Sequence, residues 1–139
     1  MTPGEIYFLR TNPMFALQRD DLWMKITNSP VSKTKARPFL FLRDGHDDNW
    51  GFFAPLKSKA KYIKDVILIP DGEINSVGKS IGNQLLSYKQ IWEIPKPFII
   101  RCEDNNLPSK KHHCVNMDYL NVKILPQCDC FINLILSSY

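Results

Sequence analysis

The sequence predicts a mainly β fold, a small barrel with short helical additions, formed by one domain over residues 1–139. Three observations predict it. Apolar residues make up 44% of the chain, which is enough for a core. They are gathered in short runs that suit strands better than helices. Prolines number ten and interrupt long helices, which argues against a helical bundle.

The first half of the chain predicts two strands separated by a long connection. Residues 5–10 are aromatic and follow a Pro-Gly pair, which is typical of a strand entering the core. Apolar spacing is mixed over residues 14–26, so a short helix and an irregular excursion both fit, and residues 27–38 are polar enough for a loop. The unbroken apolar run 39–42 then predicts a strand buried on both faces.

The middle of the chain predicts a hairpin and further short strands. Turn-forming residues occupy positions 44–49, so runs 39–42 and 50–56 are expected to pair as a hairpin, with His46 exposed at its tip. Another strand is expected at residues 65–69, and a weak strand or a short helix at residues 87–94. The total expectation is four to six strands.

The last third of the chain is less regular. Residues 98–101 are strand-like, and residues 103–113 are polar and basic enough for a loop. An amphipathic pattern over residues 115–125 favours a terminal helix. Residues 130–136 are apolar at nearly every position, so they belong to the core or form an edge strand or a dimer contact.

Positive charge is concentrated in one part of the sequence. Eight basic residues lie between Lys33 and Lys64 against three acidic ones, whereas the whole chain carries only +4. A local excess of this kind is typical of a surface that contacts phosphates, and aromatic residues nearby could stack on unpaired bases. A solvated face above core aromatics is the alternative. The residues expected to contact RNA are Lys33, Lys35, Lys61, Trp50 and Tyr62.

Several common functional motifs are missing from the sequence. It has no glycine-rich phosphate loop, no dinucleotide fingerprint, no His-Glu-x-x-His and no Gly-x-Ser-x-Gly. No apolar run is long enough for a bilayer, and residues 1–5 lack the features of a signal peptide, so a cytoplasmic protein with reduced thiols is expected. We expect no cofactor and no metal.

Binding of a structural zinc ion is an alternative role for the cysteines and histidines. Their spacing, Cys-x9-His-His-Cys-x13-Cys-x-Cys, matches structural zinc sites poorly, because such sites use tight Cys-x2-Cys or His-x3-5-His pairs. Buried free thiols and a histidine pair on the surface are therefore expected instead. The residues concerned are Cys102, His112, His113, Cys114, Cys128 and Cys130.

Three short segments accompany the predicted strands. Gly4-Glu5 opens the first strand, Arg37-Pro38 leads into the apolar strand, and Ala54-Pro55-Leu56-x-Ser58-x-Lys ends the following one. Together they resemble the MazF/Kid-like toxin superfamily, whose fold is a small SH3-like barrel. The last pattern is most similar to the ToxN/AbiQ branch, which has Pro-Leu-Thr-Ser followed by lysine. Here Lys57 replaces the threonine. The resemblance covers about residues 4–100 and implies an endoribonuclease toxin of a toxin–antitoxin or phage-exclusion system.

The resemblance also implies a chemistry and a set of site residues. RNA supplies its own nucleophile, the 2′-hydroxyl, so cleavage to a 2′,3′-cyclic phosphate and a 5′-hydroxyl needs no metal. Arg37 takes the place of the family's basic catalytic residue, assigned to phosphate stabilisation with proton transfer as an added role. Ser58 takes the place of the catalytic hydroxyl, and Lys57 and Lys59 beside it add charge stabilisation.

The expected partners follow from the same resemblance. They are single-stranded RNA as substrate and an antitoxin that is a protein in the MazF branch and a structured RNA in the ToxN branch. A homodimer is a separate expectation, which comes from the apolar run at residues 130–136 as a dimer contact. The alternative function is a non-catalytic SH3-like module that binds nucleic acid or a protein.

Overall fold

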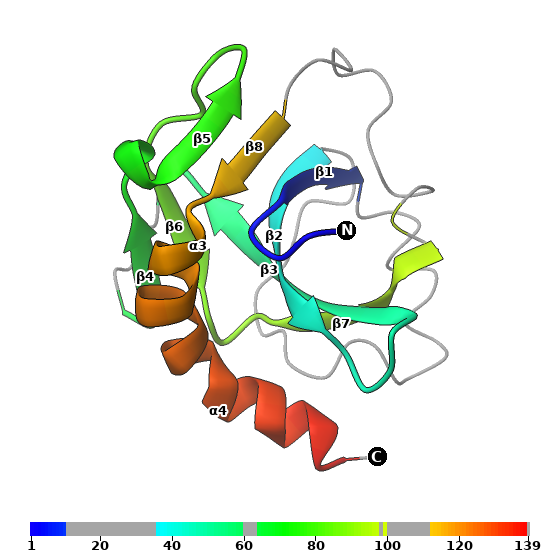
Figure 1. Ribbon diagram of the computed structural model, residues 1–139. Helices are drawn as coiled ribbons and strands as arrows, with labels where there is room; N and C mark the ends of the chain where they lie inside the picture. Colours follow the sequence, from blue (N-terminus) through cyan, green and yellow to red (C-terminus); the bar gives the residue numbers. More distant parts are fainter. Residues whose placement is uncertain (11–35, 60–63, 98, 100–111, 139) are drawn as a thin grey trace.

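The computed structural model describes residues 1–10, 36–59, 64–97, 99 and 112–138 (Figure 1). Eight strands in this part of the chain show that the protein is mainly β, as predicted, with more strands than the four to six expected. They are β1 (Ile6–Arg10), β2 (Ala36–Asp44), β3 (Trp50–Lys57), β4 (Val66–Ile69), β5 (Ile74–Val77), β6 (Gln84–Ser87), β7 (Trp92–Pro95) and β8 (His112–Val115).

The strands are antiparallel and form a curved sheet around strand β3. One sheet has the order β1-β2-β3-β6-β4, and β7 pairs with the other half of the β3 edge that β6 uses. Strands β5 and β8 form a second, two-stranded sheet. A bridge between Glu5 and Cys114 joins β8 to the start of β1, so the strands surround a common interior.

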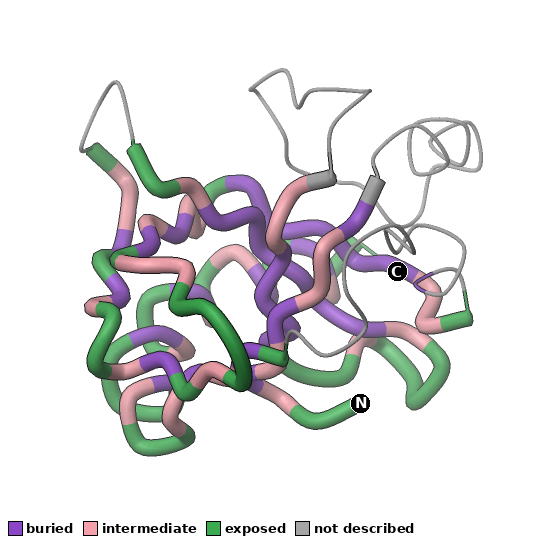
Figure 2. Tube along the Cα trace, turned by 90° about the horizontal axis from the view of Figure 1, so that it is seen from above, coloured by how far each residue is buried: buried purple, intermediate pink, exposed green. Residues whose placement is uncertain are grey.

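Strand β2 is buried on both faces, as its unbroken apolar run predicted. Leu40 and Leu42 belong to the main core, and Phe39 and Phe41 belong to a second core on the opposite face with Trp92. All of these residues are fully buried, and the buried stretches of the chain are purple in Figure 2. The hairpin prediction is also confirmed, since β2 pairs with β3 from Phe39↔Pro55 to Asp44↔Gly51.

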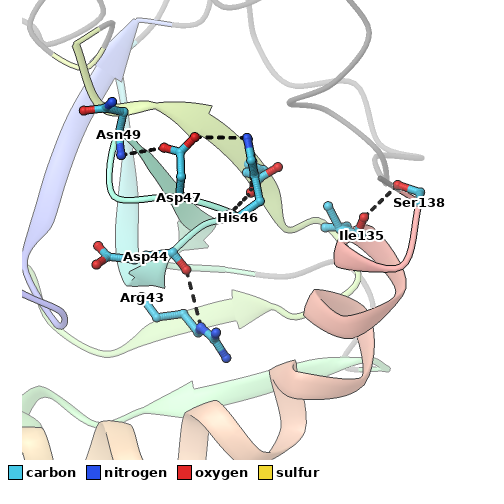
Figure 3. A network of polar contacts seen from close by, with 8 residues as sticks. Arg43, Asp44, His46, Asp47, Asn49, Ile135 and Ser138 are labelled. Carbon is cyan, nitrogen blue, oxygen red and sulfur yellow. Dashed lines mark hydrogen bonds and ion pairs between the residues drawn. The ribbon is translucent and has the colours of Figure 1, made fainter.

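The hairpin tip is fixed by a buried carboxylate, and His46 is exposed there, as expected. Glu93 on β7 is fully buried, and its Oε2 accepts hydrogen bonds from the His46 backbone N–H at 2.7 Å and pairs with its Nδ1 at 3.1 Å. Asp47 contacts Nε2 of the same ring at 3.3 Å (Figure 3). The His46 side chain is 29% exposed and lies 4.9 Å from the Trp50 ring, between centroids.

A continuous helical segment closes the main core. It comprises α3 (Met117–Tyr119), the π-helical turn η3 (Leu120–Ile124) and α4 (Leu125–Leu136), and it runs along one side of the strands (Figure 1). Pro126 has no N–H to donate to the carbonyl of Val122, which favours the wider turn before α4. The side chains that this segment buries in the main core are Leu120, Ile124, Cys128, Ile132 and Ile135.

The apolar run at residues 130–136 belongs to the core, the first of its expected alternatives. It does so as part of helix α4, in which every third or fourth residue faces the core. Other expectations for the last third were wrong. Val115 ends strand β8, so the terminal helix starts two residues later than expected. His112 and His113 lie in β8 and not in a loop. Ile99, expected in a strand, is helical.

The remaining elements connect these strands. The 3-10 turn η2 (Asp71–Glu73) joins β4 to β5, a strand that the sequence did not predict. The Glu73 carboxylate accepts a hydrogen bond from Asn116 at 3.0 Å, which ties this turn to the residue before α3. Among the described residues no helix is long and apolar enough to cross a bilayer.

Gly51 is required by the close approach of two aromatic rings. A Cβ at this position would lie 2.8 Å from the Phe41 ring and 2.9 Å from the Phe53 ring. We therefore expect Gly51→Ala to lower the free energy of unfolding by about 1–3 kcal/mol, as overpacking of a core does. Gly72→Ala is the matched control, because a Cβ there meets nothing within 4 Å. Urea denaturation of both variants measures the difference, and equal stability would contradict the prediction.

The two described cysteines of helix α4 should differ in reactivity. Burial in the main core raises the pKa of the Cys128 thiol to about 12, whereas Cys130 is exposed. Iodoacetamide reacts with the thiolate, so at pH 8 we expect it to label Cys130 and to leave Cys128 unmodified in the folded protein. Peptide mass spectrometry reads the two sites, and denatured protein labelled at both is the control. Equal labelling of both cysteines in the folded state would refute the prediction.

Candidate functional site

A pocket of about 410 Å³ lies where β2 begins, β3 ends and β6 begins. Its lining includes all four residues nominated for catalysis, which come from two segments some twenty positions apart in the sequence. Four apolar side chains and one glutamine form the rest of the wall. The lining residues are Phe8, Arg37, Pro38, Leu56, Lys57, Ser58, Lys59, Ile81 and Gln84.

Strand register explains why these residues lie at one end of the sheet. Phe39 pairs with Pro55, and continuing that register by two residues brings Arg37 across from Lys57. Lys57 pairs with Leu85 on the other side of β3, so the same continuation brings Gln84 across from Ser58. Since directly opposite residues share a face of a sheet, Ser58 and Gln84 lie on the side of the main core, whereas Arg37 and Lys57 continue the face of the second core and line the pocket from the other side of the strand ends.

The pocket is cationic. Arg37, Lys57 and Lys59 contribute three positive charges, and no carboxylate lies among the residues lining it. In the described part of the chain none of the three has an ion-pair partner. Lys59 and Ser58 are exposed, whereas Arg37 and Lys57 are partly buried. Such a set of unneutralised donors is suited to an oxyanion.

Two buried polar atoms of the pocket residues lack hydrogen-bond partners. They are Nε of Arg37, a donor, and Oε1 of Gln84, an acceptor. In folded proteins the great majority of buried polar groups have hydrogen-bond partners, so two buried atoms without partners need an explanation. Gln84 was not predicted as a site residue, because its segment carries no recognisable motif and its strand was not expected to begin there.

The residues predicted to contact RNA are not brought to this pocket by the described structure. Trp50 lies at the other end of β3, beside His46, a span of roughly 20 Å along the strand. Lys33, Lys35, Lys61 and Tyr62 lie outside the described residues. Trp92, weighed as a stacking residue, is fully buried with its ring centroid 5.8 Å from that of Phe39.

The described cysteines and histidines do not gather in one place. His113 is fully buried and its Nδ1 lies 2.7 Å from Oγ of Ser76. The expectation of a histidine pair on the surface is therefore wrong for His113. Cys128 lies in the main core and Cys130 is exposed. No cluster of three or more potential metal ligands occurs within the described ranges, and Cys102 lies outside them.

A second, larger pocket of about 560 Å³ lies beside the helical segment, between Glu73 and Lys123. Its polar side chains are mostly engaged with one another or with the strands. Asn116 donates to Glu73 at 3.0 Å and accepts from Asn75 at 2.7 Å. The hydroxyl of Tyr119 donates to the Leu68 carbonyl at 2.6 Å. The smaller cationic pocket is therefore the better candidate, because its polar groups are available to a ligand.

Comparison with known proteins does not assign a family. No protein-family model matches the sequence, and no curated protein matches it either. The cationic pocket and the short segments that supply its residues are therefore the features of the chain that indicate a function.

Proposed function

We propose that this protein is a metal-independent endoribonuclease toxin that cleaves single-stranded RNA in the cationic pocket. One observation carries the proposal. Arg37, Ser58 and the two lysines beside Ser58 were nominated by a resemblance of short segments, and these separate segments line one pocket. The resemblance does not use the strand pairing, so their convergence is independent support for a shared site.

The pocket offers the groups that phosphodiester cleavage by O2′ requires. O2′ attacks phosphorus, the bond from phosphorus to O5′ breaks, and the proton lost by O2′ is balanced by one gained at O5′. Arg37 and the lysine ammonium groups would stabilise the extra negative charge on the pentacoordinate phosphorus. The Ser58 hydroxyl would donate a hydrogen bond to a phosphate oxygen. The donor set contains no carboxylate or imidazole, and no step of the proposal uses a metal.

The proposal extends to partners and location. A toxin of this kind needs an antitoxin, and a cationic pocket suits either a structured RNA or an acidic protein segment. Action on cellular RNA places the protein in the cytoplasm. A homodimer is part of the proposal as well.

A non-catalytic nucleic-acid-binding module is the second candidate. It is favoured by one observation, the lack of histidine, aspartate and glutamate among the residues lining the pocket. These side chains most often take the proton in general base catalysis. A binding module would tolerate loss of Ser58, whereas the nuclease would not.

Expression in cells separates the two candidates. We expect induction of the wild type to arrest growth and to produce new RNA 5′-hydroxyl ends at a short shared sequence. Arg37→Ala and Ser58→Ala should each relieve the arrest, because loss of one transition-state donor lowers the rate by about a hundredfold or more. Growth curves and mapping of RNA ends from the same cultures give both readouts.

Arg43→Ala is the matched control for Arg37→Ala. Arg43 lies on the same strand but is exposed at its far end, where its Nε donates to the Asp44 carbonyl at 3.4 Å (Figure 3). This variant should remain toxic. Folded wild-type protein that neither arrests growth nor creates new ends would leave the binding module as the explanation.

Salt dependence tests whether RNA phosphates reach the pocket. Each phosphate contact contributes about 0.7 to the slope of log affinity against log salt for a single strand. Lys59→Ala should therefore lower that slope by about 0.7. Lys64→Ala, which removes an exposed lysine outside the pocket lining, should change it much less. Fluorescence anisotropy with a single-stranded RNA measures both, and equal changes would place the RNA elsewhere.

A further inference from the structure

Gln84 presents a polar atom that the proposed cleavage chemistry does not use. Its side chain is 4% exposed and lines the cationic pocket. Nε2 donates a hydrogen bond to the Ile81 carbonyl at 2.9 Å, which fixes the orientation of the amide. Oε1 therefore occupies the other side of the group, where it is buried and has no partner.

The remaining polar groups of the pocket call for a different kind of ligand atom. Arg37, Lys57 and Lys59 only donate hydrogen bonds, and an oxyanion satisfies them. An amide oxygen only accepts, so it needs a donor from the ligand. A ligand that satisfies both must carry a hydrogen-bond donor next to a phosphate. In a polynucleotide backbone, the ribose 2′-hydroxyl is that donor, and DNA lacks it.

Position and burial favour a hydroxyl over a base edge. Continuing the strand register brings Gln84 across from Ser58, the residue proposed to hold the phosphate. Oε1 has almost no accessible surface, so contact with a ligand requires its neighbours in the pocket wall to move on binding, and a single hydroxyl requires a smaller movement than the wide edge of a base. An unsatisfied buried acceptor destabilises the free protein, and a hydrogen bond from a substrate hydroxyl would remove that destabilisation on binding.

We propose that Oε1 of Gln84 accepts a hydrogen bond from the ribose 2′-hydroxyl next to the bound phosphate and makes the pocket prefer RNA to DNA. This inference rests on the proposed function, because it assumes that a polynucleotide phosphate lies against Arg37 and Ser58. Gln84 takes no proton, since an amide oxygen is a very weak base. Its role is to bind the sugar and to orient O2′.

Binding to three matched single strands tests the contact. The probes are an RNA of mixed sequence, its 2′-deoxy counterpart and its 2′-fluoro counterpart, which keeps an RNA-like sugar pucker but cannot donate. Ser58→Ala protein is used throughout so that the RNA stays intact. It should bind RNA about fivefold more tightly than either other strand, the factor expected of one neutral hydrogen bond.

A second substitution assigns the preference to Gln84. Adding Gln84→Met to the Ser58→Ala protein should reduce RNA affinity to the level of the 2′-deoxy strand and leave the affinity for the other two strands unchanged. Gln90→Met is the matched control, because Gln90 is also a buried glutamine with an unpartnered Oε1 but does not line the pocket. The control variant should keep the fivefold preference. Fluorescence anisotropy gives the affinities, and thermal denaturation checks that each variant is folded.

The outcomes separate this inference from the proposed function. Equal binding of RNA and 2′-fluoro RNA by the Ser58→Ala protein would overturn the inference. This test does not require a substitution at Gln84. A uniform loss of affinity for all three strands in Gln84→Met would also overturn it. If the wild type cleaves RNA but the Ser58→Ala protein shows no preference for the 2′-hydroxyl, the Gln84 contact is contradicted and the proposed nuclease function is supported. If binding prefers RNA in a way that depends on Gln84 but the wild type does not cleave RNA, the Gln84 contact is supported and the proposed nuclease function is contradicted.

Discussion

The structure depends on the burial of both faces of the β2–β3 hairpin. Alternate residues of β2 fill the main core and the second core, and β3 follows the same alternation. Full burial of each large apolar side chain contributes about 1.5–3 kcal/mol, so a slip of register would exchange two complete sets of contacts. This constraint fixes where the two strands start and end. The cationic pocket lies at those ends, so the packing of the core sets the positions of its residues.

The central strands were predictable because their sequence pattern has one physical solution. Four consecutive apolar residues at 39–42 fit a strand with no solvent-exposed face, and the turn-forming residues after them require the chain to reverse. The nomination of Arg37 and Ser58 came from a resemblance, and strand pairing brings both to one pocket. The fold and the grouping of these residues were therefore within reach of the sequence, whereas their activity is a proposal.

Other features could not be predicted because they depend on partners distant in the sequence. His113 is buried in a strand through its contact with Ser76, and nothing in the polar segment around it indicates that partner. The apolar run at residues 130–136 hides its helical period, since side chains facing away from the core are apolar as well, as Leu134 shows at 56% exposure. Gln84 has no local motif, and only pairing of β6 with β3 places it across from Ser58.

The two ends of the β2–β3 hairpin carry opposite charge among the described residues. Arg37, Lys57 and Lys59 gather at one end. Asp44, Asp47 and Asp48 lie at the turn on the other, where Arg43 and Lys96 offset part of their charge and leave a smaller negative excess. Such a separation gives the hairpin an electric dipole along its length. A polyanion diffusing toward the molecule would be turned by this field before contact, so that encounters are biased toward the cationic end. The resulting rate of association would fall steeply with ionic strength, even for strands that are never cleaved.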